Sequence, residues 1–159
     1  MIPRCRSGPR ESPMSETAAF MALVETASLE GIVNRQKYLK IHGPQDLGWS
    51  YANILDVAAK LTRQLQRKGF FRIYIYVSNN DDTVRYCMYV TDLMTYEKPV
   101  LFDDPVDGRQ YLVHSRMKIK SISELEPPMA LGEFTSVDRR KPDLRHLQLG
   151  FLFVVDPEV

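Results

Sequence analysis

Histidines and cysteines are the residues of this chain whose chemistry is most easily put to catalytic or metal-binding use. His42, His114 and His146 are the only histidines, and each is far in sequence from a cysteine or serine in an activating context. Cys5 and Cys87 do not have the spacing of a structural zinc site, and a disulfide between them would require the N-terminal segment to dock on the fold. No catalytic or metal-binding motif emerges from these residues.

Paired aspartates and glycine-rich loops are the next possibilities. The pairs Asp81-Asp82 and Asp103-Asp104 could hold a divalent ion, but adjacent carboxylates in turn-rich segments are more often exposed to solvent, and EF-hand spacing is absent. The sequence has neither a Walker-type phosphate loop nor the GxGxxG dinucleotide motif. We therefore expect no metal, no cofactor and no enzyme, although an active site built from distant residues would leave no local signature.

The charge of the chain gives no sign of a general polyanion binder. The chain has 21 Lys and Arg residues and 20 Asp and Glu residues, which gives a formal net charge of +1. Residues 1–13 carry three arginines and one glutamate, hence +2, which leaves −1 on residues 14–159. If nucleic acid is the ligand, a few local groups must recognise it.

The composition indicates one domain at residues 14–159. With 44% hydrophobic residues, a chain of 159 residues can bury a continuous core. Residues 1–13 are rich in Pro, Ser, Gly and Arg and are expected to be a disordered tail or an artefact of an upstream start codon. Without an apolar run for a signal peptide or a bilayer span, and with two distant cysteines, we expect a soluble, cytoplasmic protein with no membrane partner. The oligomeric state stays open.

The elements that must position any site follow from hydrophobic periodicity. The apolar stripe from Ile54 to Leu65, capped by Ser50 or Asn53 and ended by Gly69, predicts a helix. Alternation predicts a strand over 72–77 that pairs as a hairpin with 84–91 in the middle of the sheet. The other expected elements are a helix over 15–31, strands over 36–41, 111–113, 117–122 and 150–155, an exposed loop over 99–108, a stop at 126–128 and a helical turn at 131–134.

These elements predict an α+β fold with a small, bent or closed mixed β-sheet and flanking helices. Within this order, the residues that stand out are Trp49, Asn53, Gly69, the run Tyr74–Asn79, and the segment from Met117–Lys120 through Leu125, Pro128, Leu131 and Phe134. Their order resembles the EVE domain of the PUA-like superfamily over about residues 36–156. The family usually carries His where this chain has Val77.

The resemblance implies a pseudo-barrel with a pocket between the loop that contains Trp49 and the Ser78-Asn79 end of the tyrosine-rich strand predicted over 72–77. Related domains insert a flipped, modified base into this pocket. Such a pocket needs aromatic faces for stacking and polar groups that read the base edge. The aromatic candidates are Trp49, Tyr51 and Tyr76, and the polar candidates are Asn53, Ser78 and Asn79. Each also has a structural interpretation: core packing for Trp49, sheet coverage for Tyr76, a helix cap for Asn53 and a turn for Ser78-Asn79.

Three functions follow as hypotheses. The first is a non-catalytic module that binds DNA or RNA through a modified or flipped base. The second is a protein-interaction or scaffold domain, in which residues 15–31 and the Pro127-Pro128 region present apolar surface to a partner. The third is a small-molecule binder that uses the same pocket. Convergence of the Trp49 indole and the Asn79 amide on one cavity would favour the first or third over plain packing.

Overall fold

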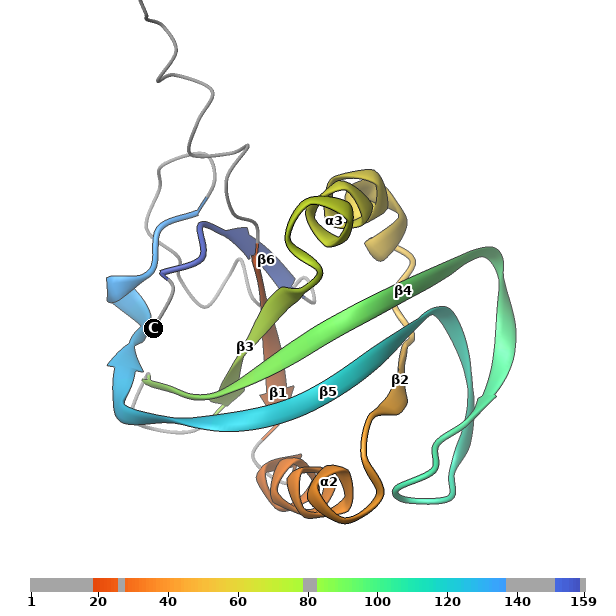
Figure 1. Cartoon of the computed structure of the whole chain (residues 1–159), viewed down its shortest axis with the longest axis horizontal. Helices are drawn as coiled ribbons and strands as arrows, with labels where there is room; N and C mark the ends of the chain where they lie inside the picture. The colour runs from red at the N-terminus through yellow and green to blue at the C-terminus, as the bar shows by residue number, and fades with distance from the viewer. Residues whose placement is uncertain (1–18, 26–27, 79–82, 137–150, 158–159) are drawn as a thin grey trace, which may run out of the picture.

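The computed structural model describes residues 19–25, 28–78, 83–136 and 151–157 (Figure 1). Residues 1–13, Ser15 and Asn79 lie outside these ranges. Two helices and six strands follow in the order β1 (Ala19–Glu25), α2 (Ser28–His42), β2 (Gln45–Trp49), α3 (Ile54–Lys68), β3 (Phe71–Ser78), β4 (Thr83–Asp103), β5 (Gln110–Ala130), a 3-10 turn (Leu131–Glu133) and β6 (Phe151–Val154).

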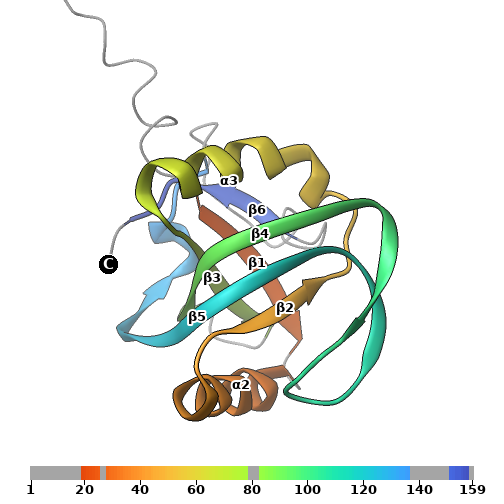
Figure 2. The ribbon, with the colours of Figure 1, turned by 45° about the vertical axis from the view of Figure 1, so that its right-hand side comes forward.

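The strands form one mixed sheet in the order β2-β5-β4-β3-β1-β6. β1 and β3 are parallel, and the other neighbours are antiparallel. The α+β fold with a bent mixed sheet is therefore confirmed, as is the antiparallel β3–β4 pair at its centre. The long β4–β5 hairpin bends strongly, and its tip turns back toward α2 and β2 (Figure 2). At the bend, residues 96–99 of β4 stand opposite a single residue of β5, His114, and such a bulge adds twist and curvature.

α3 forms as the sequence predicts. Asn53 occupies its N-cap position, and Gly69 ends it at φ 83° with its N–H donating to the Leu65 carbonyl at 2.8 Å. Ile54 and Leu61 are fully buried on the stripe that faces the sheet. The terminal 3-10 turn and the last strand, expected near residues 131–134 and 150–155, are also confirmed.

The helix predicted over 15–31 is wrong, because residues 19–25 form β1 and α2 begins only at Ser28. Both faces of β1 are buried: Phe20 and Ala22 belong to one core cluster, Ala19 and Met21 to another. A strand buried on both faces reads as a continuous apolar run, which periodicity alone cannot distinguish from a helix. The strand predicted over 36–41 is also wrong, since these residues lie in α2.

The loop predicted over 99–108 is shorter than expected. Residues 99–103 continue β4, and the connection between β4 and β5 is residues 104–109. β5 is one strand where two and a stop were predicted. Its prolines are tolerated because the register shifts there, with Val84 opposite Met129 and Tyr86 opposite Glu124, so residues 125–128 bulge out of the ladder.

The sheet buries a core cluster on each face. Ile73, Ile75 and Val77 of β3 join the cluster that also contains buried residues of α2 and α3, whereas Tyr74 and Tyr76 belong to the second cluster. Beside the second cluster, the Asp156 carboxylate accepts hydrogen bonds from the Tyr74 hydroxyl at 2.6 Å and from Arg72 at 2.8 and 2.9 Å. This buried clamp ties the segment after β6 to β3. No helix in the described ranges has the length and apolarity to cross a bilayer.

Candidate functional site

A cavity of about 650 Å³ lies between α2, the sheet and the tip of the β4–β5 hairpin. Its volume is in the range of small-molecule sites, about 300–1,000 Å³. Apolar side chains of the strands, α2 and the hairpin tip line the cavity together with polar side chains of α2 and the hairpin tip. The apolar residues are Ala22, Leu23, Ile32, Leu47, Ile75, Met88, Val106 and Ile122, and the polar ones are Asn34, Arg35, Asp104, Asp107 and Arg109.

Two aromatic residues at the end of β2 join the wall of the cavity to its rim. Trp49 is the last residue of β2, is 8% exposed and packs on the Phe20 ring with centroids 5.9 Å apart. Tyr51 is 57% exposed and meets the Trp49 ring edge-on at 5.9 Å and 67°. Trp49 is thus part of the core and of the cavity wall at once, while Tyr51 leaves a ring face open to a ligand.

An open groove continues from the cavity past these aromatic rings. Its volume is about 590 Å³, and most of its lining, including Trp49, Tyr51 and Tyr111, is shared with the cavity. Ser50 and Gln110 line the groove alone. A ligand held in the cavity could therefore extend outward past Tyr51 without leaving the protein surface.

A bidentate ion pair between α2 and the hairpin tip forms part of the cavity lining. Arg35 of α2 donates to both carboxylate oxygens of Asp104, at 3.2 and 2.6 Å, and the two side chains are 14% and 2% exposed. Burial by itself would raise the pKa of Asp104, but hydrogen bonds from Arg35 and from the Val106 backbone N–H hold it below its usual value. Asp104 is therefore a carboxylate at neutral pH, paired with a planar guanidinium whose fork matches it.

Tyr111 stands beside this pair, with its hydroxyl 3.4 Å from the Asp104 Oδ2 atom. Burial, together with the nearby Asp104 carboxylate, raises the pKa of Tyr111 to about 12, so the phenol stays neutral and can donate a hydrogen bond.

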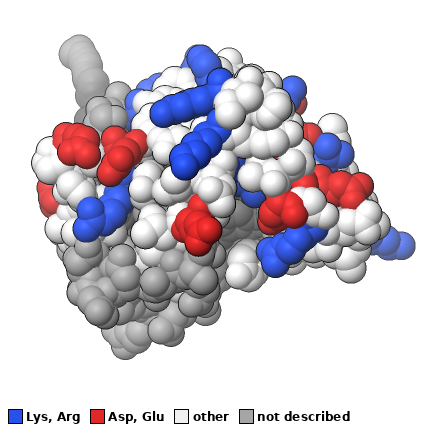
Figure 3. All heavy atoms as spheres, turned by 90° about the horizontal axis from the view of Figure 1, so that it is seen from below, with Lys and Arg blue, Asp and Glu red and all other residues white. Residues whose placement is uncertain are grey.

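The charges around the cavity are balanced. Arg35 is matched by Asp104, and Arg109 lies 3.4 Å from Asp107 in an exposed pair. Figure 3 views the molecule from below and shows acidic and basic side chains interspersed, with no broad basic surface on this face. Such a site favours an uncharged part of a ligand over a polyanion.

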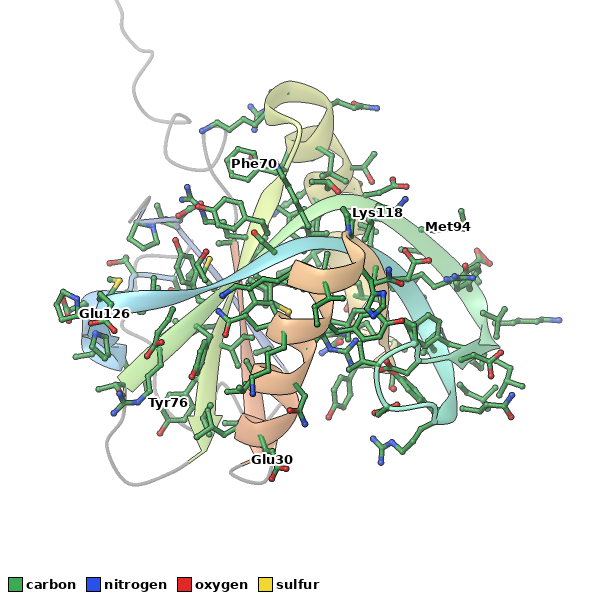
Figure 4. All side chains as sticks on the ribbon, turned by 60° about the horizontal axis from the view of Figure 1, so that its bottom comes forward. Glu30, Phe70, Tyr76, Met94, Lys118 and Glu126 are labelled. Carbon is green, nitrogen blue, oxygen red and sulfur yellow. The ribbon has the colours of Figure 1, made fainter. Side chains whose placement is uncertain are left out.

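The structure brings together only some of the predicted site residues. Trp49 and Tyr51 line the cavity, and Asn53 lies just beyond them at the start of α3 without a side-chain capping bond. Tyr76 is 1% exposed in the second core cluster, on the other face of β3 from Ile75, and Figure 4 shows it on the side of α2 away from the hairpin tip. Ser78 ends β3, where its backbone pairs with Glu25. Asn79 lies outside the described residues, so the convergence of the Trp49 indole and the Asn79 amide on one cavity stays a prediction.

Sequence reasoning missed the polar half of the cavity. Arg35 and Asp104 are 69 positions apart, and Asn34 lies in α2 between the end of the helix predicted over 15–31 and the start of the strand predicted over 36–41. The Asp103-Asp104 pair did stand out, but as an exposed turn or weak cation site. In the described part of the chain, no three His, Cys, Asp or Glu side chains group in a way that could hold a metal ion.

The remaining candidates for chemistry are away from the cavity. His42 stacks on Tyr38 with centroids 4.2 Å apart, and the His114 Nδ1 atom lies 3.0 Å from the Tyr96 carbonyl at the hairpin bend. Cys87 is 2% exposed, and burial raises the pKa of its thiol to about 12. Among the described residues, the cavity lining contains no histidine or cysteine, and its polar side chains are carboxylates, guanidinium groups, a carboxamide, phenols and an indole.

Comparison with known proteins adds no family: the chain matches no protein-family model and no curated protein sequence.

Proposed function

We propose that the chain is a non-catalytic binding module that takes an unpaired, modified base of DNA or RNA into the cavity beside Trp49. One observation carries this proposal: a ligand-sized cavity whose wall is the Trp49 indole and whose rim is the exposed Tyr51 ring. An aromatic rim offers stacking to any base, and the shape of the cavity behind the rim can discriminate between bases.

The polar wall supports recognition of a base edge. The carboxamide of Asn34 offers both a donor and an acceptor, and the Tyr111 hydroxyl offers a donor beside the Arg35–Asp104 pair. The residue order that resembles the EVE domain is consistent with this use of Trp49. In contrast, Tyr76 lies on the other face of the sheet and has no role in the proposal.

The balanced charges predict weak dependence on salt. Arg109, which lines both the cavity and the groove, is 78% exposed and is the cation best placed to meet a phosphate. On single strands the slope of log K against log salt is about −0.7 for each phosphate neutralised. We expect a slope between 0 and about −1.4, which corresponds to at most two neutralised phosphates.

Fluorescence anisotropy of labelled single-stranded oligonucleotides tests the proposal. A set that differs only in one central base, unmodified or methylated cytosine or another modified base, is titrated with the protein, with Tyr51→Ala and with Tyr38→Ala. Loss of one stacking contact costs about 1–3 kcal/mol, or roughly 5- to 150-fold in Kd, so Tyr51→Ala should weaken binding by that factor.

Tyr38→Ala is the matched control, because Tyr38 is a partly buried tyrosine of α2 that does not line the cavity. Binding that is absent for every oligonucleotide, or that weakens equally in both variants, would contradict the proposal. If the protein binds free nucleosides but none of the oligonucleotides, the cavity is a small-molecule site instead.

A protein-interaction function has one observation in its favour. Leu101 and Leu112 pair directly across β4 and β5, and they are 61% and 57% exposed. Together with Met94, which is 57% exposed and lies on the outer part of β4 (Figure 4), they are the large apolar side chains of the hairpin that face solvent. Sedimentation across a range of concentrations tests this alternative: association that Leu101→Asp abolishes would support it, and a monomer throughout would not.

A further inference from the structure

The tip of the β4–β5 hairpin, residues 104–109, is a small closed loop with its own hydrogen bonds. The Asp104 N–H donates to the Arg109 carbonyl, and the Gly108 N–H donates to the Asp104 carbonyl, both at 2.9 Å. The Asp104 Oδ1 atom accepts from the Val106 N–H at 2.8 Å, and Gly108 has φ 73°. These local contacts hold the shape of the tip.

The strands that carry the tip are firmly attached to the rest of the protein. Phe102 and Val113 are 2% and 0% exposed and lie against the backbone of Gly48 in β2, where an added Cβ atom would come within 2.7 Å of both side chains. The last pair before the tip is Asp103 with Gln110. Any opening is thus confined to the residues beyond that pair.

α2, which faces the tip across the cavity, is also fixed, because the Gln36 Nε2 atom donates to the Ile122 carbonyl of β5 at 2.8 Å. The bidentate Arg35–Asp104 pair joins the tip to α2 over the cavity. A buried ion pair gives orientation more than net stability, because the cost of desolvating both charges offsets much of their attraction.

We propose that residues 104–109 form a lid over the cavity, that the Arg35–Asp104 pair is its latch, and that ligand exchange requires the latch to open. The base then enters with the lid open and is enclosed when Asp104 returns to Arg35. The identity of the enclosed ligand rests on the proposed function. The opening and closing of the lid does not depend on that function.

The single tryptophan of the chain provides a readout that needs no ligand. Trp49 lines both the cavity that the lid covers and the open groove beside it, so the rise in its quenching by acrylamide above the wild-type value reports opening of the cavity. In a lidless variant, Asn-Gly replaces residues 104–109 and joins Asp103 to Gln110 as a two-residue hairpin turn. In Arg35→Met, the Asp104 carboxylate loses the guanidinium that joins it to α2 and keeps only partners within the hairpin, the Val106 N–H and the Tyr111 hydroxyl.

We expect the quenching constant to rise several-fold in both variants. Arg116→Met is the matched control, since it removes an arginine that bonds Asp46 in a more exposed pair away from the lid, and its quenching should stay at the wild-type value. Near-UV circular dichroism and the unfolding midpoint establish that each variant is folded, and Arg35→Met alone tests the lid if the lidless variant does not fold.

A quenching constant equal to the wild-type value in the folded variants would overturn the proposal of a lid, whatever the protein binds. A quenching constant that rises in the lidless variant but not in Arg35→Met would overturn the proposal that the ion pair is the latch. A rise in both, with no binding of any oligonucleotide, would leave the lid in place and reject the proposed nucleic-acid ligand.

Discussion

Replacement of Gly48 by alanine is the sharpest test of how the hairpin lies on β2. Gly48 needs to be glycine because of close approach: a Cβ atom there would lie 2.6 Å from Val113 Cγ1 and 2.7 Å from Phe102 Cδ2. Neither neighbour can move easily, since both side chains are buried. Overpacking of this kind typically costs about 1–3 kcal/mol.

Urea denaturation followed by Trp49 fluorescence measures this cost, and a chain of this size should lose about 2–4 °C in Tm for each kcal/mol. Gly31→Ala is the matched control, because a Cβ atom at Gly31 in α2 would have nothing within 4 Å, and alanine in a helix is favoured over glycine by about 0.8–1.0 kcal/mol. We therefore expect the two variants to change stability in opposite directions. If Gly48→Ala is as stable as the wild type, the close contact between the hairpin and β2 is refuted.

Three further predictions concern buried groups. In a Cys5→Ser background, Cys87 should not react with a thiol reagent at pH 8 until the protein unfolds, because the thiol is buried with its pKa raised to about 12; rapid labelling of the native protein would contradict this. Asp156→Asn should lower the free energy of unfolding by about 3–5 kcal/mol in chemical denaturation, because it removes the counter-charge of a mostly buried Arg72; a loss under about 1 kcal/mol, the usual worth of an exposed ion pair, would mean that the clamp is solvated. The folded-state pKa of Asp104 is lowered, so its contribution to the free energy of unfolding is fully present above the unfolded-state pKa of about 3.9 and is lost as the pH falls through the folded-state pKa. Plots of the free energy of unfolding against pH for the wild type and Asp104→Asn should therefore run parallel from about pH 5 to 8 and converge in acid. A difference between the two plots that changes near pH 7 would contradict the assignment.

The elements that could be predicted from the sequence each show a single, clear hydrophobic periodicity. α3 has a single apolar stripe with an αL glycine at its end, and β3 alternates strictly, so local physics and tertiary packing agree. β1 was not predictable because both of its faces are buried, in two different clusters. α2 buries Ile32 and Leu39 and little else fully, so its stripe is too thin to stand out from the polar background.

The residues of the candidate site likewise divide into those with a signal in the sequence and those without one. Trp49 and Tyr51 were identified because the resemblance to the EVE domain implies an aromatic pocket beside the loop that contains them. For the tyrosine-rich strand, alternation indicates two faces but not which of them meets the cavity, and it is Ile75, not Tyr76, that does so. The Arg35–Asp104 pair exists only because the hairpin bends back onto α2, which nothing local in either segment encodes.

The central claim is that a base enters the cavity beside Trp49, and the indole N–H of this residue tests it most directly. In the two-dimensional ¹⁵N–¹H spectrum, the only tryptophan gives a single indole signal. Addition of a single-stranded oligonucleotide with the preferred modified base should shift that signal saturably, and its unmodified counterpart should shift it much less. An indole signal that stays fixed while the oligonucleotide binds elsewhere, or in the absence of any binding, would contradict the account.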